Sequence, residues 1–370
     1  MKVKFSYLEE QFADPDPILQ EIKKVVQSGD FTLGKQVGQF EEKFAQVIGT
    51  KYAVGVNSGT DALFLSLKAL GIGAGDEVIT MTSTFIASAG AIAQTGATPV
   101  FVDCDAEYLI ALDQIEKAIT PRSKAILPVH YAGHPVDMPK ILEIAKKHNL
   151  HVVEDACQGI QAAIDGKCAG SFGIAGGFSL HPLKNINVWS DGGIITTNSK
   201  EMAEKLRLLR NHGMKNRDEY AFFGYNSRLD TVQAAVGLYL IKDLDFITSQ
   251  RIKNAAKYDS ALSKIEEITV PARRKNGRYV YHLYIIQAKK RDELLAHLIK
   301  NGIEAKVHYP FPLHLQECSK HLGYKKGDFP IAENQAKNII TLPVHQHLTD
   351  EAVQYTIDQI TQFYAKELVK

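Results

Sequence analysis

The stretch AVGVNSGTDALFLSLKAL, residues 53–70, carries the pattern that decides the fold class. Its first part, 53–56, is a short apolar run of the kind found in buried strands. Its last part, 61–70, has apolar residues three and four positions apart, which is the spacing of one buried helical face. The residues between them, NSGTD, are typical of a turn that leads into a helix. The stretch therefore predicts a strand, a turn and a helix in succession.

The same alternation continues toward the middle of the chain. Further strand patterns occur at 77–81, 99–102, 125–129 and 151–153. Helix patterns lie between them at 85–94, 112–119 and 138–148. Such alternation predicts a mostly parallel sheet with helices on both faces, in which ligands bind at the carboxyl ends of the strands.

The second half of the chain changes character. Strand patterns at 176–181 and 192–197 flank a loop that contains Lys184, and a helix pattern follows at 200–209. The pattern is then helical over 230–262, strand-like over 268–288, and helical again at 292–301 and 349–366. We therefore expect an α/β protein with a large domain over residues 1–245 and a smaller domain over residues 246–370.

Composition excludes several classes of protein. Lys and Arg total 43 against 42 Asp and Glu, so no charge excess favours nucleic acid or an acidic membrane. The N-terminal residues 1–17 contain no apolar run, which predicts neither a signal peptide nor a membrane span. We expect a cytoplasmic protein with free thiols and no metal site, because zinc or iron–sulfur spacing is absent from its cysteines, Cys104, Cys157, Cys168 and Cys318.

The turn NSGTD, residues 57–61, is a candidate anion site. Backbone amides and the dipole at the start of a helix both favour a bound anion, and phosphate is the usual one. Neither a Walker A pattern nor a dinucleotide GxGxxG pattern is present, so the phosphate belongs to another kind of ligand. An ordinary turn with Thr60 or Asp61 as the helix N-cap is the alternative.

Two acids stand where a buried strand ends. In VVEDACQ, residues 152–158, Glu154 and Asp155 occupy a position that is unfavourable for charge unless a cation or a donor meets it. A protonated ring nitrogen would be such a partner. A structural ion pair or a helix cap is the alternative.

Lys184 lies in FSLHPLKN, residues 178–185, which leads to DGG at 191–193. The surrounding pattern predicts a constrained turn, and lysine is the residue that forms Schiff bases. Its amine reacts only when neutral, so such a site requires burial or a nearby cation. An ordinary surface charge is the alternative.

Taken in order, these segments and others resemble one family. SGTDAL, TFIAS, EDACQ, FSLHPLKN with DGG and TTN, and GYNSRLDTVQAA follow one another as in the DegT/DnrJ/EryC1/StrS sugar aminotransferases, over nearly the whole chain. The resemblance implies pyridoxal 5'-phosphate (PLP) fold type I. That fold has a seven-stranded, mostly parallel sheet in the large domain and a smaller α+β C-terminal domain. It also implies a homodimer with shared active sites.

The resemblance assigns roles to residues of this chain. Lys184 would hold PLP as a Schiff base and move protons, and Asp155 would pair with the pyridine nitrogen. Phe85 would stack on the ring and Gln158 would bind its phenolic oxygen. The implied set of cofactor-binding residues is Ser58, Gly59, Thr60, Phe85, Asp155, Gln158, Ser179, Lys184 and Asn226.

Other implied residues bind substrates. Asn226 would reach the phosphate in the neighbouring subunit, and Arg228 beside it would take the carboxylate of the amino donor. His308 and Tyr309 match a segment near the sugar pocket, although packing is an equal alternative for them. One departure from the family pattern is Ser190, where a glycine is usual.

The implied reaction transfers an amino group from L-glutamate to a keto or aldehyde group of a sugar, with pyridoxamine 5'-phosphate (PMP) as the intermediate form of the cofactor. A nucleotide-linked sugar for a cell-surface polysaccharide or an antibiotic is the expected acceptor. The alternatives are a free sugar acid such as an octulosonate, and a PLP-dependent dehydratase, against which Lys184 argues because those relatives carry histidine there. A regulator without catalysis is disfavoured because no basic recognition helix is visible.

Overall fold

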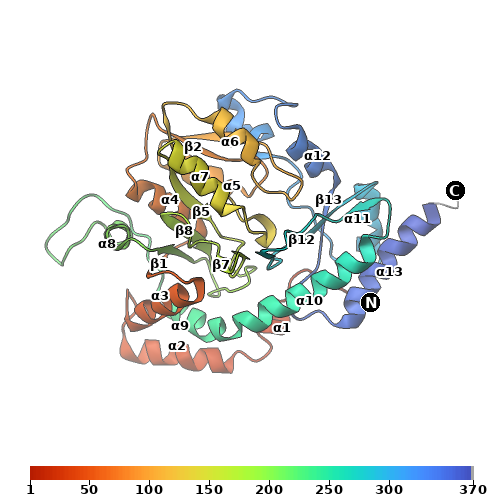
Figure 1. The fold of residues 1–370 in the computed structure, drawn as a ribbon. Helices are drawn as coiled ribbons and strands as arrows, with labels where there is room; N and C mark the ends of the chain where they lie inside the picture. Colours follow the sequence, from red (N-terminus) through yellow and green to blue (C-terminus); the bar gives the residue numbers. More distant parts are fainter. Residues whose placement is uncertain (368–370) are drawn as a thin grey trace.

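The molecule is organised around a seven-stranded sheet with the strand order β1-β9-β8-β5-β4-β2-β3 (Figure 1). The computed structural model describes residues 1–367. β9 pairs antiparallel with both of its neighbours and the other pairs are parallel, so the expected mostly parallel sheet is confirmed. Its strands are β1 (Tyr52–Val56), β2 (Glu77–Met81), β3 (Thr98–Val102), β4 (Ser123–Leu127), β5 (His151–Asp155), β8 (Ala175–Ser179) and β9 (Gly193–Thr197).

Helices cover both faces of this sheet. Ala53 of β1 and Ile194 of β9 pack into a cluster with α3 and α9, whereas their neighbours Val54 and Ile195 pack with α4 and α8 on the other face. This alternation buries both faces, which explains the continuous apolar runs of the strands. The helices of this part are α2 (Asp16–Ser28), α3 (Lys35–Ile48), α4 (Gly59–Ala69), α5 (Ile86–Gln94), α6 (Leu112–Ala118), α7 (Met138–Lys147), α8 (Lys200–Leu209) and α9 (Thr231–Leu240).

The reversal of β9 positions the loop that carries Lys184. Because β8 and β9 are antiparallel neighbours, the connection 180–192 leaves the sheet and returns to it at the same edge. The parallel neighbours β5 and β8 both end at that edge, at Asp155 and Ser179. β1 ends there as well, since Val56 pairs with Gly193. Three strand ends and one loop therefore converge on one place.

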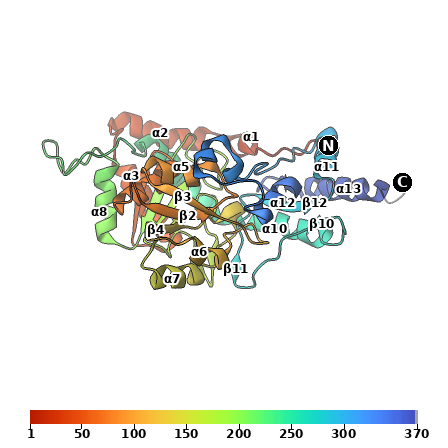
Figure 2. The ribbon, with the colours of Figure 1, turned by 90° about the horizontal axis from the view of Figure 1, so that it is seen from above.

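A second, antiparallel sheet lies at the other end of the molecule. It has the order β10-β12-β13 and packs with α10 (Leu244–Leu262), α11 (Arg291–Lys300) and α13 (Asp350–Glu367). Figure 2 shows α8 at one end and α11 and α13 at the other, with α10 between. Since α10 reaches from the large sheet to the small one, the boundary at residue 245 stays a prediction. The strands of this sheet are β10 (Ile268–Thr269), β12 (Tyr284–Ala288) and β13 (Ile339–Leu342).

The strand-like segment 268–288 is not one continuous strand. The segment divides into β10, β11 (Gly277–Arg278) and β12, and β11 joins another small sheet with β6 (Ala163–Ile164) and β7 (Lys167–Cys168). Pro271 and Gly277 bound the interruption, and both residue types favour breaks in a strand. The remaining elements are α1 (Leu8–Gln11), α12 (Pro330–Asn338) and the 3₁₀ helices η1 (Tyr131–Gly133), η2 (Ile241–Asp243), η3 (Leu313–Leu315) and η4 (Glu317–Leu322).

The N-terminal segment is fastened to the small sheet region. Val3 pairs with Ile303, and its amide donates to the carbonyl oxygen of Gly302 at 2.8 Å. The amide of Phe5 donates to the Glu304 carboxylate at 3.0 Å. Among the described residues 1–367, no helix is long and apolar enough to cross a membrane.

Candidate active site

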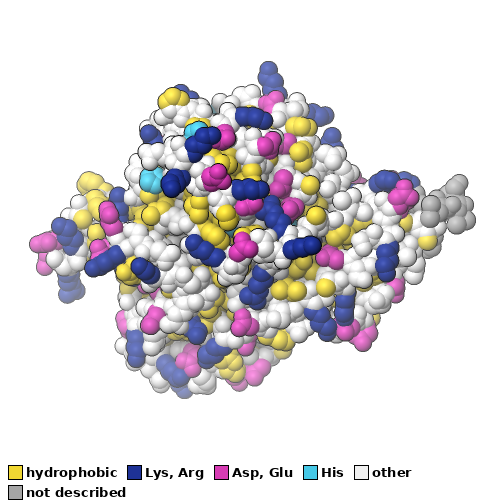
Figure 3. Space-filling view, in the orientation of Figure 1, with side chains coloured by type: hydrophobic (Ala, Val, Ile, Leu, Met, Phe, Trp, Pro, Cys, Tyr) yellow, Lys and Arg dark blue, Asp and Glu magenta, His cyan; other side chains and the backbone are white. Residues whose placement is uncertain are grey.

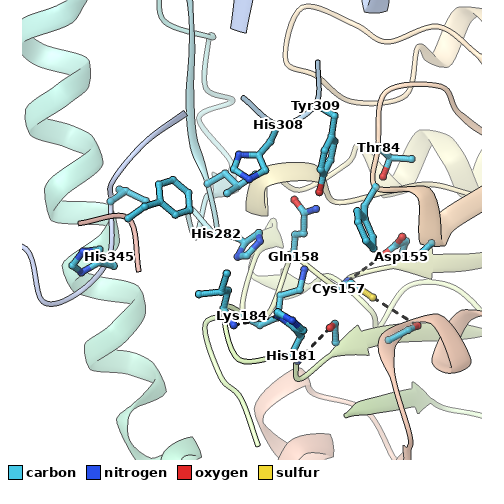
Figure 4. Close-up of a pocket in the computed structure, with 18 of the residues that line it drawn as sticks. Thr84, Asp155, Cys157, Gln158, His181, Lys184, His282, His308, Tyr309 and His345 are labelled. Atoms are coloured by element: carbon cyan, nitrogen blue, oxygen red, sulfur yellow. Dashed lines mark hydrogen bonds between the residues drawn. The ribbon is translucent and has the colours of Figure 1, made fainter. Parts of the chain in front are cut away.

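A cavity of about 400 Å³ opens at the edge of the sheet where β1, β5 and β8 end (Figure 4). Most of the residues expected at the site line it, and Asn226 and Arg228 do not. The expected residues that it brings together are Ser58, Gly59, Thr60, Phe85, Asp155, Gln158, Ser179, Lys184, His308 and Tyr309.

The start of α4 forms one wall. The helix begins at Gly59, two positions before the predicted start, and Ser58 is its N-cap. The Ser58 hydroxyl accepts a hydrogen bond from the amide of Asp61 at 3.0 Å, so the alternative with Thr60 or Asp61 as the N-cap was wrong. The amides of Gly59 and Thr60 lie in the first turn, where a helix supplies no partner for them. These amides are therefore available to an anion.

Gly59 allows α4 to approach the sheet closely. A Cβ atom at this position would lie 2.6 Å from the Cβ atom of Ser179 and 3.0 Å from the Cys157 sulfur. No side chain fits in that space. The Ser179 hydroxyl at the end of β8 is thus held against the helix N-terminus, and together they make a small cradle for an anion.

Alternation along β5 separates the two acids at its end. Glu154 is fully buried and faces away from the cavity, whereas Asp155 lines the cavity. Glu154 is saturated by donors, so its role is structural: it accepts from His130 Nε2 at 3.0 Å and from the amides of Gly170 at 2.8 Å, Phe172 at 2.7 Å and Gly173 at 2.8 Å. The two acids therefore differ: Glu154 is part of a buried structural network, and Asp155 is the acid that faces the cavity.

Asp155 keeps capacity for another partner. One carboxylate oxygen accepts from the Ser88 hydroxyl at 2.6 Å, and the other accepts from the amide of Cys157 at 3.1 Å. A carboxylate can accept about four hydrogen bonds. A buried acid with remaining acceptor capacity in a cavity suits a cationic N–H group of a ligand.

Lys184 reaches the same cavity from the loop between β8 and β9. Burial lowers the pKa of its amine from the ordinary value of 10.5, while Cys157 and Asp155 oppose that shift. Its backbone is held on two sides: its amide donates to the carbonyl oxygen of His181 at 2.8 Å, and the Tyr7 hydroxyl donates to its carbonyl oxygen at 2.8 Å. The amine is therefore presented by a fixed turn, and its lowered pKa gives it more of the nucleophilic form than an exposed lysine has.

Aromatic and polar side chains complete the cavity, as Figure 4 shows for Tyr309, His308 and Gln158. The half-exposed ring of Phe85 lies 5.9 Å from that of Tyr309, measured between centroids. Gln158 accepts from the amide of Ala132 at 2.7 Å, which leaves its amide nitrogen as a donor. Burial, with Lys306 and Lys184, lowers the pKa of His308 to about 4, so its imidazole is neutral at pH 7.

Asn226 and Arg228 lie outside this cavity, at the base of an arm over residues 211–226 that projects beside α8 (Figure 1). Asn226 is exposed and forms an isolated bridge with Asn211. Arg228 donates to the Asn211 side chain at 3.0 Å. Their assignment to a neighbouring subunit's site stays a prediction.

Four further residues of the cavity were not anticipated from the sequence: Tyr7, Arg251, His282 and His345. They come from the N-terminal segment, from α10 and from the strand and loop regions of the small sheet. No local motif surrounds them, because each is brought to the site by tertiary packing. Arg251 lies among the buried positions of α10, which is unusual for arginine but is visible only in the structure.

The sequence matches known proteins along nearly its whole length. A family model described as the DegT/DnrJ/EryC1/StrS aminotransferase family matches residues 14–361. The chain is 44% identical to the pleiotropic regulatory protein of Geobacillus stearothermophilus, over 98% of this chain and 99% of that protein. It is 41% identical to the dTDP-3-amino-3,4,6-trideoxy-alpha-D-glucose transaminase of Streptomyces venezuelae, over 92% of this chain and 90% of the relative.

Solved structures agree with this assignment. DesV of S. venezuelae in complex with a ketimine intermediate matches with a TM-score of 0.95 at 39% identity, over 98% of each chain. NtdA of Bacillus subtilis with bound cofactor PMP matches with a TM-score of 0.90 at 31% identity, over 98% of this chain and 85% of the other. The expected fold and family are confirmed: the chain belongs to the DegT/DnrJ/EryC1/StrS aminotransferase family.

Proposed function

We propose that this protein is a PLP-dependent aminotransferase that moves an amino group from L-glutamate to a keto group of a nucleotide-linked sugar. One observation carries the proposal: Lys184, Asp155 and the N-terminus of α4 meet in one cavity. An amine of lowered pKa, a buried acid and a cradle for an anion are the three groups that a phosphorylated pyridine aldehyde requires.

The cavity fits PLP group by group. The cradle of Gly59, Thr60 and Ser179 suits the phosphate, because a helix N-terminus favours an anion and no side chain fills the space at Gly59. The carboxylate of Asp155 suits a protonated ring nitrogen. Phe85 offers an aromatic face for the ring. When bound, PLP supplies an electron sink for negative charge that develops beside the amino nitrogen.

The residues of the chain have distinct tasks in such a reaction. Asp155 would keep the ring nitrogen of the bound cofactor protonated, and the Ser88 hydroxyl and Cys157 amide hold this carboxylate in place. Lys184 Nζ, whose pKa burial lowers, would be the group that takes a proton from the carbon next to the amino group and gives one back. The walls of the cavity exclude bulk water from this exchange.

The acceptor sugar enters beside His308 and Tyr309. Both line the cavity, and the neutral imidazole of His308 can donate or accept a hydrogen bond with a sugar hydroxyl. The transaminase of S. venezuelae, 41% identical, is named for a dTDP-linked amino sugar, which supports a nucleotide-linked acceptor. Biosynthesis of a cell-surface polysaccharide or an antibiotic sugar is the corresponding role.

A homodimer completes the site in this proposal. The arm over residues 211–226 stands away from the body of the chain, and Phe223 on it is fully exposed, with Tyr220 58% exposed. Figure 3 shows hydrophobic side chains on this projecting part, together with charged ones of both signs. Contact with a second copy would cover these aromatic rings and bring Asn226 and Arg228 to the partner's cavity. We also propose a cytoplasmic location, supported by four cysteines that form no disulfide in residues 1–367.

A non-catalytic regulator is the second candidate, because a relative that is 44% identical carries a regulatory name. Lys184 in a cavity with Asp155 favours catalysis, since a scaffold requires no amine of lowered pKa. Lys184 also disfavours the dehydratase alternative.

The absorbance spectrum of the PLP-loaded protein tests the proposal. L-glutamate should bleach the band of bound PLP and release 2-oxoglutarate in equal amount, and a nucleotide-linked keto sugar should restore the band. A panel of keto sugars with and without a nucleotide, including a free sugar acid, identifies the acceptor. A spectrum that L-glutamate leaves unchanged would support the regulator instead.

A further inference from the structure

We propose that the guanidinium of Arg251 is a carboxylate-binding subsite of the cavity, and that ring nitrogens of His282 and His345 beside it meet neighbouring polar groups of the ligand. The ligand is an acid group of the amino donor or of the sugar. The inference rests on the proposed function for the identity of those two substrates, but the subsite itself follows from unpartnered polar atoms.

Arg251 is a buried cation in the wall of the cavity. Its side chain comes from α10 and the residue is 2% exposed. Nη1 donates to the main-chain carbonyl oxygens of Tyr281 at 3.1 Å and His282 at 3.4 Å. The guanidinium carbon lies 5.1 Å from the centre of the Tyr7 ring. These contacts occupy one nitrogen and one face of the group.

Burial lowers the pKa of this group, Tyr7 is the side chain that raises it, and no carboxylate within residues 1–367 does so. Nε and Nη2 of Arg251 are buried and have no hydrogen-bond partner. A buried charged group whose N–H donors make no hydrogen bond is energetically unfavourable. Nε and Nη2 lie on one edge of the planar group, so their N–H bonds form the fork that matches the two oxygens of a carboxylate.

Two histidines extend this group of unpartnered atoms. Nδ1 of His282 and Nδ1 of His345 are also buried without a partner, and both residues line the cavity. His345 donates from Nε2 to the carbonyl oxygen of Lys4 at 3.1 Å, so its Nδ1 is an acceptor and suits a donor group of the ligand, not the carboxylate itself. Every unpartnered buried side-chain atom among the cavity-lining residues belongs to Arg251, His282 or His345. Such a concentration in the wall of one cavity indicates a ligand rather than isolated packing defects.

Tyr7 packs against the subsite. Nε and Nη2 are shielded from solvent in this conformation, and Tyr7 is the cavity-lining ring that stacks on the face of the guanidinium. Because the Tyr7 hydroxyl also donates to the carbonyl oxygen of Lys184 at 2.8 Å, we expect the ring to stay in place when a carboxylate binds along the edge of the guanidinium.

The subsite competes with Arg228 for the same role. Family resemblance assigns the donor carboxylate to Arg228, which lies outside the cavity and already donates to Asn211 at 3.0 Å. Arg251 lies within the cavity of its own chain and has the free fork. The two assignments predict different results for the same ligand.

Binding of glutarate to the PLP-loaded protein, measured by calorimetry, tests the donor arm. Glutarate has two carboxylates and no amino group, so its affinity does not depend on turnover. We expect Arg251→Lys to reduce the affinity for glutarate about 10- to 100-fold, because lysine keeps the charge but lacks the two parallel N–H donors. Arg291→Lys is the matched control. Nη1 of Arg291 also donates to two main-chain carbonyl oxygens, at 3.3 and 2.9 Å, far from the cavity, and its loss should leave the affinity unchanged.

A second pair of probes tests the sugar arm. UDP-glucuronate and UDP-glucose differ in one carboxylate and cannot accept an amino group. If the sugar supplies the acid, Arg251→Lys weakens UDP-glucuronate alone, and glutarate binds as to the wild type. If the donor supplies the acid, Arg251→Lys weakens the binding of glutarate. The glutamate concentration for half-maximal bleaching then rises by the same factor, with little change in the limiting rate.

Three results would overturn the subsite. Arg251→Lys could bind both acidic probes as tightly as the wild type, or Arg291→Lys could lose as much affinity as Arg251→Lys. Alternatively, Arg228→Lys alone could lose affinity for glutarate. If Arg251→Lys does not fold, a crystal structure of the wild type with glutarate decides, since a carboxylate belongs within about 3 Å of Nε or Nη2. A protein that binds glutarate through Arg251 but never transaminates would refute the proposed function and keep the subsite.

Discussion

The hydroxyl of Tyr7 donates a hydrogen bond of 2.8 Å to the main-chain carbonyl oxygen of Lys184, although the two residues are 177 positions apart in the sequence. Tyr7 is 3% exposed and belongs to the segment that is fastened to the small sheet region through Val3 and Phe5. The position of the reactive lysine thus depends on a segment that no active-site motif includes.

Tyr7→Phe should reduce the maximal rate of amino transfer while the protein remains folded. Loss of this hydrogen bond removes about 1 kcal/mol and frees the carbonyl of the Lys184 turn. Tyr258→Phe is a matched control, because its hydroxyl donates to the carbonyl oxygen of Pro343 at 3.0 Å, away from the cavity. Thermal unfolding should show similar losses for both variants, and stopped-flow absorbance should show slower bleaching for Tyr7→Phe only. Equal rates in the two variants would reduce Tyr7 to a packing residue.

Lys184→Arg should abolish transamination, because a guanidinium keeps the charge but does not attack a carbonyl. The variant should fold, since the side chain lies in a cavity and not in a packed core. The assay is 2-oxoglutarate release from L-glutamate with a keto sugar present. Lys200→Arg, at the exposed start of α8, is the control and should be fully active. Turnover in Lys184→Arg would remove this residue from the catalytic role.

Asp155→Asn should retain PLP but slow the chemical step by about 100-fold or more, because a neutral amide does not hold the ring nitrogen protonated. Glu154→Gln is an informative comparison. Glu154 accepts four hydrogen bonds away from the cavity, so its replacement should lower thermal stability and leave the catalytic rate per folded molecule near that of the wild type. An unchanged kcat in Asp155→Asn would contradict the assignment.

The stability of the cofactor-free protein should rise with pH below pH 10.5 because of Lys184. Burial lowers the pKa of Lys184 below its unfolded value of 10.5, so the unfolded chain binds more protons between the two values. The free energy of unfolding therefore increases with pH in that window, and it does not below the lowered pKa. Lys184→Met should flatten the slope, as denaturant titrations of both proteins at several pH values would reveal. Parallel slopes would mean that Lys184 keeps its ordinary pKa.

Mixing Lys184→Ala with Asn226→Ala should restore activity if each site uses residues of two chains. After subunit exchange, one site of a heterodimer collects both defects and the other collects neither, which predicts up to half of the wild-type activity per heterodimer. Native mass spectrometry verifies the exchange. A mixture that stays inactive with heterodimers present would end the shared-site assignment of Asn226.

The sequence was most informative where function requires a local pattern. The turn at Gly59, the acids at 154–155 and the lysine turn each combine a strand end with unusual residues, and the structure brings all three to one cavity. Their finer geometry was not readable from the pattern. Alternation on β5 assigns Glu154 to a structural role and Asp155 to the cavity, but either assignment was compatible with the sequence because its strand end was uncertain.

Residues that join the site through tertiary packing had no such pattern. Arg251 occupies a helical position like any other and is distinguished only by its burial. The interruption of the strand expected over 268–288 has a similar cause. β11 pairs with β6, a contact that residues near 164 supply and that the local sequence does not contain.

The reversed strand β9 also sets an order of events during synthesis of the chain. β1 lies at the edge of the sheet, and its neighbour β9 is made more than a hundred residues later. β2, β3, β4 and β5 are complete by Asp155 and can pair with one another first. Gly59 packs closely on Ser179, and Gly193 at the start of β9 packs on the main chain of Ser58 so closely that a Cβ atom there would collide with it. The phosphate cradle therefore takes its final form only after β9 has been synthesised. Cofactor binding is therefore a late step in the synthesis and folding of this enzyme.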